Sequence, residues 1–172
     1  MGWLCGWRCS TCWRVECSKR TLREQVSENR RTLLRGGRVV DPVNGLDERI
    51  DVLIEAGCVA SIGDQAQHQG DAAVVNVPGG AVICPGFIDM HVHLREPGHE
   101  YKETVATGVA AAVAGGFTAV ACMPNTRPVN DDAGVTQLIL AKADAAGLAR
   151  VYPVGAVTRG QSGEQLAEIG EL

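Results

Sequence analysis

The residues best suited to chemistry are His91, His93 and Arg95, which stand at two-residue steps after an apolar segment. That segment, residues 81–89, is short and apolar enough to form a buried strand. Because side chains alternate between the faces of an extended chain, we expect these three side chains and Asp89 to share one face. Two neighbouring imidazoles are good ligands for zinc or a similar ion, and a planar guanidinium suits a carboxylate. The spacing therefore predicts a metal site beside an anion-binding site.

A purely structural histidine pair is the alternative to this metal site. Here the pair ends an apolar segment and is followed by a turn at residues 95–98, in which proline and glycine break regular structure. Barrel enzymes place their chemistry at such carboxyl ends of strands, which favours the metal site. For Asp89 two roles stay open, namely orienting a metal ligand or bonding the backbone.

A second polar position follows the next apolar segment, residues 117–123, where the chain continues with Pro124, Asn125 and Thr126. This position comes one βα repeat later, so we expect Asn125 at the same rim. Its carboxamide can donate and accept, which suits a substrate that carries a carboxylate next to an amide. Pro-Asn-Thr alone is more often a turn, but beside Arg95 it becomes a second candidate substrate contact.

After residue 80 the sequence alternates between apolar segments and amphipathic ones, which predicts an α/β fold with a parallel sheet. We expect strands at residues 81–89, 117–123 and 151–157. The first helix should run from about Val105 to Gly115-Gly116, and the second from a cap at Asn130, Asp131 or Asp132 to Gly147. A third helix is expected from Gln165 onward. A closed barrel needs eight strands and usually about 250 residues. With three expected strands, we interpret the chain as incomplete.

Residues 32–80 carry short β-type segments separated by glycine-containing turns, one of them at Gly36 and Gly37. They predict a small β-module of about fifty residues, which is too small to hold a large core alone. Three cysteines in apolar surroundings are expected to fill cores, namely Cys58, Cys84 and Cys122.

Residues 1–31 differ in composition from the rest, since they hold all three tryptophans and four of the seven cysteines. The spacing of Cys5, Cys9 and Cys12 resembles the cluster-binding triplet of radical enzymes that use S-adenosylmethionine. Thr11 replaces the apolar or aromatic residue usual before the last cysteine of that triplet. We therefore interpret this segment as a leader outside the fold.

The composition, with 45% hydrophobic and 21% charged residues among 172, is ordinary for a soluble globular protein. A net charge of −4 gives no electrostatic case for binding nucleic acid or an anionic membrane. No segment offers the ~20 consecutive apolar residues that span a bilayer. Polar residues interrupt residues 1–14, so this segment lacks the apolar core of a signal peptide. A cytoplasmic location is the default expectation.

The chain contains the sequence PGFIDMHVHLREPG at residues 85–98 and MPNT at residues 123–126. Together they resemble the dihydroorotases of the amidohydrolase superfamily, and the similarity extends from about Leu33 to the C-terminus. The resemblance implies a (β/α)8 TIM-type barrel, of which residues 81–172 supply the first three βα units. A small β-sandwich at residues 32–80 would precede it.

In that family the residues matching His91 and His93 bind zinc, as one or two ions, and those matching Arg95 and Asn125 hold the substrate carboxylate. The resemblance implies reversible hydrolysis of (S)-dihydroorotate to N-carbamoyl-L-aspartate in pyrimidine biosynthesis. It also places the remaining metal ligands and the proton-shuttling acid beyond Leu172. We therefore assign no catalytic acid or base within the chain and expect the chain alone to be inactive.

Two other functions stay open. Hydantoinases and allantoinases are cyclic amidases that share the His-x-His sequence but usually lack the arginine and the Pro-Asn-Thr at these positions. A non-catalytic dihydroorotase-like partner of aspartate carbamoyltransferase usually loses metal ligands, and His91 and His93 argue against that role. The complete protein is expected to act on a small molecule and to form a homo-oligomer.

Overall fold

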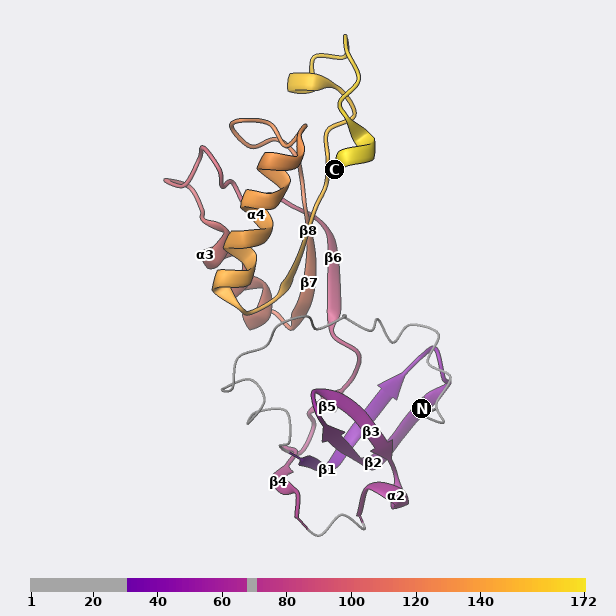
Figure 1. Ribbon diagram of the computed structural model, residues 1–172. Helices are drawn as coiled ribbons and strands as arrows, with labels where there is room; N and C mark the ends of the chain where they lie inside the picture. The colour runs from indigo at the N-terminus through magenta and orange to yellow at the C-terminus, as the bar shows by residue number, and fades with distance from the viewer. Residues whose placement is uncertain (1–30, 68–70) are drawn as a thin grey trace. The chain divides into compact units, whose positions relative to one another are not determined.

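The computed structural model describes residues 31–67 and 71–172. The leader predicted at the N-terminus, with its cysteine triplet, lies outside the described residues. Contacts divide the chain into two compact units, and the division falls after Pro85 rather than after residue 80 (Figure 1).

The difference arises because residues 81–89 form two strands where the sequence predicts one. Val82–Ile83 (β5) pair with the sheet of the first unit, whereas Phe87–Val92 (β6) belong to the sheet of the second. Pro85 and Gly86 separate them, since both residues interrupt regular strand pairing.

The first unit is built on one five-stranded sheet. Its elements are β1 (Thr32–Asp41), β2 (Leu46–Glu55), β3 (Cys58–Ile62), the short helix α2 (Asp64–Gln67), β4 (Ala73–Asn76) and β5. β2 lies antiparallel between β1 and β3, whereas β4 and β5 both pair parallel with β1. Leu33, Leu53 and Ala66 form its buried core. A β-sandwich needs two packed sheets, whereas the described part of this unit contains a single sheet.

β1 continues through Gly36 and Gly37, so the turn predicted there is wrong. The register with β2 shifts between Leu34 and Gly37, and Gly36 has a left-handed φ of 72°. The buried carboxylate of Asp51 accepts the Gly36 N–H at 2.8 Å, which gives that amide a partner inside the irregularity. The two glycines therefore bulge the strand without ending it.

The second unit is a three-stranded parallel sheet with two helices on one face (Figure 1). Its elements follow in the order β6, α3 (Val105–Ala114), β7 (Phe117–Cys122), α4 (Ala133–Ala146) and β8 (Arg150–Pro153). The α/β class and the parallel pairing are thus confirmed. The core between sheet and helices consists of Leu94, Val105, Val109, Val120, Cys122, Val135, Ile139, Ala143, Ala149 and Val151.

Both helices begin and end close to where the sequence predicts, and Gly115 is the C-cap of α3. The Thr104 hydroxyl accepts the Thr107 N–H at 3.1 Å, and the Thr104 N–H donates to the Thr107 hydroxyl at 3.0 Å, which closes a capping box on α3. Of the three candidate caps of α4, Asp132 is the one used. Gly147 ends α4 with a left-handed φ of 61°. Within the described ranges, no helix has the length and apolar composition to cross a membrane.

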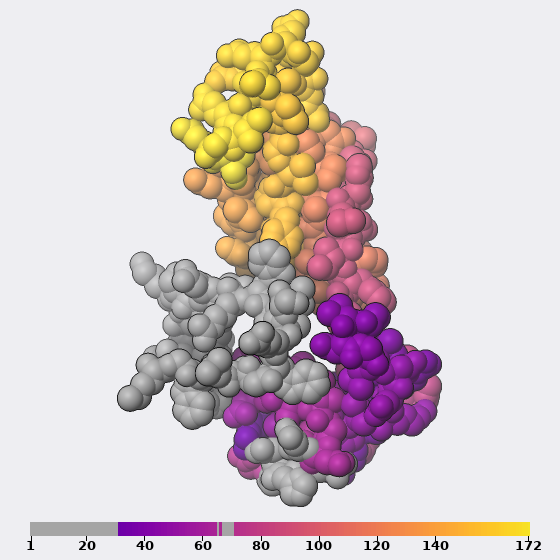
Figure 2. Space-filling model, turned by 90° about the vertical axis from the view of Figure 1, so that its right-hand side faces the viewer, coloured from indigo at the N-terminus to yellow at the C-terminus, as the bar shows by residue number. Residues whose placement is uncertain are grey.

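The helix predicted from Gln165 is wrong. The segment after β8 contains two 3-10 turns, η1 (Arg159–Gln161) and η2 (Ile169–Glu171). A bridge between Thr158 and Leu166 folds this part of the chain back on itself, which excludes the local pairing of a helix. In Figure 2 the segment, coloured yellow, forms the end of the second unit beyond the orange α4.

Of the three cysteines predicted to fill cores, one is buried and two are exposed. Cys122 is buried between sheet and helices, and this burial raises the pKa of its thiol to about 11. Cys58 and Cys84 are exposed, so the core role predicted for them is wrong. Cys58 begins the outer strand β3 and Cys84 lies between β5 and β6, where no core surrounds them.

Candidate metal centre

The loops after β6 and β7 leave the sheet at one edge, because the two strands are parallel. Their backbones are joined, since the Met123 N–H donates to the Val92 carbonyl at 2.8 Å and the Arg127 N–H to the Pro97 carbonyl at 2.9 Å. Gly98 has a φ of 95°, and a Cβ at this position would overlap the backbone oxygen of Arg127. The two loops that carry the predicted site residues therefore pack closely against each other.

His91 and His93 lie together at the end of β6. Their ring centroids are 5.2 Å apart and their planes are inclined at 69°. A register shift between Asp89 and Val92 marks an irregularity in β6. That Asp89, His91, His93 and Arg95 share one face stays a prediction. The Asp89 carboxylate accepts the His91 N–H at 3.0 Å, which is the backbone role of the two considered for it.

Asn125 lies against His93, with its Oδ1 2.7 Å from the ring Nδ1. An amide oxygen can only accept, so this contact requires the proton on Nδ1 and leaves the lone pair on Nε2. Metal-binding histidines in proteins are oriented in this way by a partner on the second ring nitrogen. The structure thus brings together two of the predicted site residues, in a relationship that the sequence did not indicate.

His91 and His93 are of a residue type that zinc prefers as a ligand. Their imidazoles lie side by side, and the contact with Asn125 fixes the tautomer of His93. The pair does not complete a site. Among the described residues no group of three or more histidine, cysteine, aspartate or glutamate side chains could hold a metal. His91 and His93 would therefore supply part of a coordination shell that needs at least one more protein ligand.

Arg95 lies beyond the end of β6 in a tight turn. The Glu96 N–H donates to the Leu94 carbonyl at 2.8 Å, and Arg95 between them has a φ of 66°. A left-handed φ is uncommon for a residue other than glycine and persists where the surroundings enforce it. Within the described part of the chain the guanidinium has no hydrogen bond or ion pair, which leaves it available to an anion.

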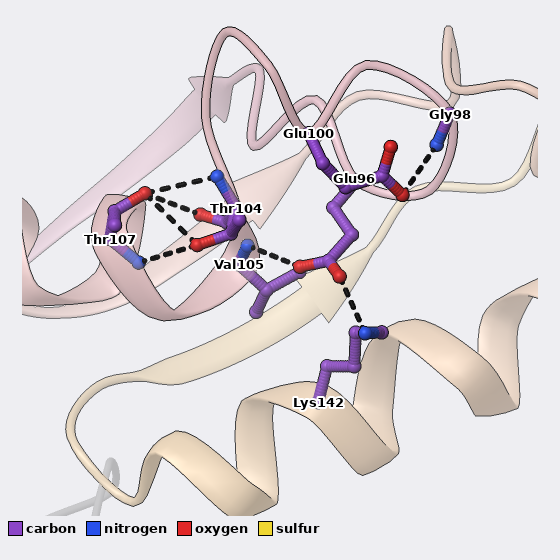
Figure 3. Close-up of polar contacts among 7 residues, drawn as sticks. All are labelled: Glu96, Gly98, Glu100, Thr104, Val105, Thr107 and Lys142. Carbon is purple, nitrogen blue, oxygen red and sulfur yellow. Dashed lines mark hydrogen bonds and ion pairs between the residues drawn. The ribbon is translucent and has the colours of Figure 1, made fainter.

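Glu96 is a buried charged residue for which the sequence predicts no role. It is 6% exposed. Its carboxylate accepts the Val105 N–H at 2.8 Å and pairs with the Lys142 ammonium at 2.5 Å (Figure 3). This carboxylate raises the pKa of Lys142, chiefly through the hydrogen bond. The available signal was an acidic residue directly after Arg95 in the turn, but its burial could not be inferred from the sequence.

Asn130 is another buried polar residue that shapes the rim. It is fully buried, donates to the Val154 carbonyl at 3.0 Å and accepts the Thr136 hydroxyl at 2.7 Å. Its N–H also bonds to the Pro124 carbonyl at 3.0 Å. The sequence predicts only a candidate helix cap at Asn130, whereas its side chain ties the loop carrying Asn125 to α4 and to the end of β8.

The chain matches the family model described as dihydro-orotase-like over residues 80–172, which is more than half of its length. The chain belongs to this family.

Curated members of the family are similar over most of the chain. Identity is 61% over 139 residues with a dihydroorotase of Anaeromyxobacter sp. (strain K), covering 81% of this chain and 32% of the relative. It is 54% over 140 residues with a dihydroorotase of Geobacter sulfurreducens, covering 81% and 33%. The chain thus spans about a third of the length of these relatives.

Solved structures share the fold. The L-hydantoinase (dihydropyrimidinase) from Arthrobacter aurescens aligns with a TM-score of 0.64 at 21% identity, covering 74% of this chain and 28% of that one. The dihydropyrimidinase from Brevibacillus agri NCHU1002 aligns with a TM-score of 0.53 at 26% identity, covering 73% and 26%. The dihydro-orotase-like chain therefore corresponds in fold to part of these larger proteins.

Proposed function

We propose that the protein acts as a dihydroorotase, which hydrolyses the ring amide of (S)-dihydroorotate to N-carbamoyl-L-aspartate and catalyses the reverse reaction in pyrimidine biosynthesis. The observation that carries the proposal is the convergence of the His91–His93 pair with Asn125 at one edge of a parallel sheet. Relatives at 61% and 54% identity that bear the name dihydroorotase support the choice of substrate.

The architecture that we propose for the whole protein is a (β/α)8 barrel. Three parallel strands, with helices on one face, support this as its first part. The remaining metal ligands and the acid that moves the proton would come from the part of the protein that the longer relatives contain. The β-sandwich proposed for the first unit would likewise need strands beyond the single sheet described.

His91 and His93 would hold zinc as one ion or as part of a pair, with the Nε2 of His93 turned to the metal by Asn125. Zinc, when bound, supplies a nucleophile at neutral pH and polarises the ring carbonyl. Arg95 would fix the substrate carboxylate through charge-assisted hydrogen bonds. The Asn125 amide nitrogen still carries donors for the same carboxylate, so its contact with His93 is compatible with a role in substrate binding.

The substitution Arg95→Ala tests the substrate assignment in the native-length protein purified from cells that carry the gene. A lost hydrogen bond to a charged group costs about 1.5–3 kcal/mol, so KM for dihydroorotate should rise about 10- to 100-fold while the zinc content stays normal. Arg95→Lys is the matched control, because it keeps the charge and loses the planar fork. An unchanged KM in Arg95→Ala would remove this residue from the substrate site.

Hydantoin hydrolysis is the second candidate activity, favoured by the similarity to dihydropyrimidinase structures. The available guanidinium of Arg95 argues for a substrate that carries a carboxylate. Turnover of dihydroorotate and of a hydantoin by the same preparation separates the two activities. A non-catalytic partnership with aspartate carbamoyltransferase, a homo-oligomeric assembly and a cytoplasmic location stay predictions.

A further inference from the structure

Glu96 joins the loop after β6 to both helices of the second unit. The Val105 N–H belongs to the first residue of α3, and Lys142 lies in the third turn of α4. Figure 3 shows the Glu96 carboxylate between these two partners, apart from the neighbouring bond of the Gly98 N–H to Glu100. One buried side chain thus links three elements of the fold.

A buried carboxylate is stable only when it is paired and hydrogen-bonded, and Glu96 meets both conditions. The first N–H groups of a helix have no partner within the helix. In α3 the Thr104 hydroxyl satisfies the Thr107 N–H, and Glu96 satisfies the Val105 N–H. A negative charge at this end of a helix is also favoured by the helix dipole. The position of Glu96 is therefore fixed by several interactions at once.

The same position fixes Arg95. Its left-handed turn is closed by the bond between Glu96 and Leu94, and both of these flanking residues are buried. Leu94 is held by the apolar core and Glu96 by its polar partners. An uncommon backbone conformation persists only when such neighbours enforce it. Releasing one of the two anchors should let Arg95 return to ordinary backbone conformations.

We propose that Glu96 is a positioning residue, which holds the backbone of Arg95 so that the guanidinium meets the substrate carboxylate. This inference rests on the proposed function in one respect, namely that Arg95 binds that carboxylate. It assigns Glu96 no contact with substrate or metal.

The kinetic test combines Glu96→Ala and Glu96→Gln with Arg95→Ala in the native-length protein. Glu96→Ala should raise KM for dihydroorotate about tenfold with little change in kcat, and Glu96→Gln, which keeps an acceptor for Val105, should raise it less. In the Arg95→Ala background, Glu96→Ala should change KM by less than about twofold, because the residue through which it acts is gone. An equal effect in both backgrounds would overturn the proposal.

A matched control separates positioning from general loss of stability. Thr104→Ala removes the cap of α3 and should lower the unfolding midpoint, but it leaves both contacts of Glu96 in place. KM for dihydroorotate should stay within about twofold of the unsubstituted value in this variant. A rise in KM equal to that of Glu96→Ala would show a merely structural role and overturn the proposal.

Amide hydrogen exchange tests the backbone position of Arg95 without measuring enzyme activity. The His99 N–H donates to the Arg95 carbonyl at 3.0 Å, so its protection reports the position of Arg95. Glu96→Ala should speed exchange of this amide and Thr104→Ala should not. Unchanged exchange in Glu96→Ala would overturn the positioning role, whatever the substrate. Inactivity of the unsubstituted protein on dihydroorotate, with exchange altered as expected, would instead overturn the proposed function.

Discussion

The Nδ1 of His93 lies 2.7 Å from the Oδ1 of Asn125, and this contact joins the ends of two neighbouring parallel strands. It presents the opposite ring nitrogen as a potential metal ligand. Partners of this kind typically change metal affinity 10- to 100-fold when they are removed.

Replacing Asn125 should therefore alter both the tautomer and the metal affinity. In Asn125→Ala we expect nitrogen-15 NMR of the imidazoles to show a mixture of His93 tautomers, because the acceptor for Nδ1–H is lost. Zinc affinity of the native-length protein, measured by competition with a chelator, should fall about tenfold. Asn125→Asp keeps an acceptor oxygen and should retain the tautomer. Equal tautomer populations in Asn125→Ala and the unsubstituted protein would contradict this role.

Gly98→Ala should destabilise the second unit more than an ordinary left-handed glycine does. A side chain in this region costs roughly 1–2 kcal/mol, and at Gly98 the new Cβ would also overlap the backbone of Arg127. Gly163 is the matched control, because its φ is 81° and open space surrounds it. Urea unfolding of both variants isolates the cost of the overlap. Equal losses of unfolding free energy would show that the two loops can move apart.

The Glu100 carboxylate should stabilise its loop in a pH-dependent way. The Gly98 N–H donates to it at 2.9 Å and lowers its pKa. A group whose pKa is lower in the folded state contributes stability above its unfolded pKa, and this is lost as pH falls through the folded value. The difference in unfolding free energy between the unsubstituted protein and Glu100→Gln should be constant near neutral pH and shrink below about pH 4. Glu164→Gln, at an exposed position, is the control, and an identical pH profile in both variants would count against the bond.

Asn130→Ala should be strongly destabilising. It leaves the Val154 carbonyl and the Thr136 hydroxyl without their partner, at roughly 1–3 kcal/mol for each buried group. Asn44→Ala, in an exposed turn where the side-chain amide donates to Asp41, should cost far less. Thermal or urea unfolding measures both changes. A small effect at Asn130 would mean that water replaces its side chain.

The parts of the fold that the sequence predicted are those governed by local chemistry. Asp132 caps a helix because its carboxylate can reach the first free N–H groups, and Gly147 ends that helix because it accepts a left-handed φ. The alternation of strands and helices after residue 86 follows from the same local signals. The His91–His93 pair was placed correctly at a strand end because apolar segments and polar turns are visible in any sequence.

The parts that were missed depend on contacts distant in sequence. Whether Gly36 and Gly37 turn or bulge a strand is decided by Asp51 on the neighbouring strand. The helix expected from Gln165 is replaced by turns because of a bridge back to Thr158. Glu96 is buried because Lys142, 46 positions away, pairs with it. None of these partners is marked by spacing or composition.

The three-stranded sheet has a consequence for the 172-residue chain when it is handled without the further strands of the proposed barrel. β6 and β8 are its outer strands, and among the described residues nothing pairs with their outward backbone edges. Ile88, Met90 and Tyr152 on these strands are 63%, 79% and 50% exposed. Open edges with apolar side chains recruit strands from any chain nearby. In the 172-residue chain alone, light scattering per unit mass should therefore rise with protein concentration, because separate copies can pair along these strands.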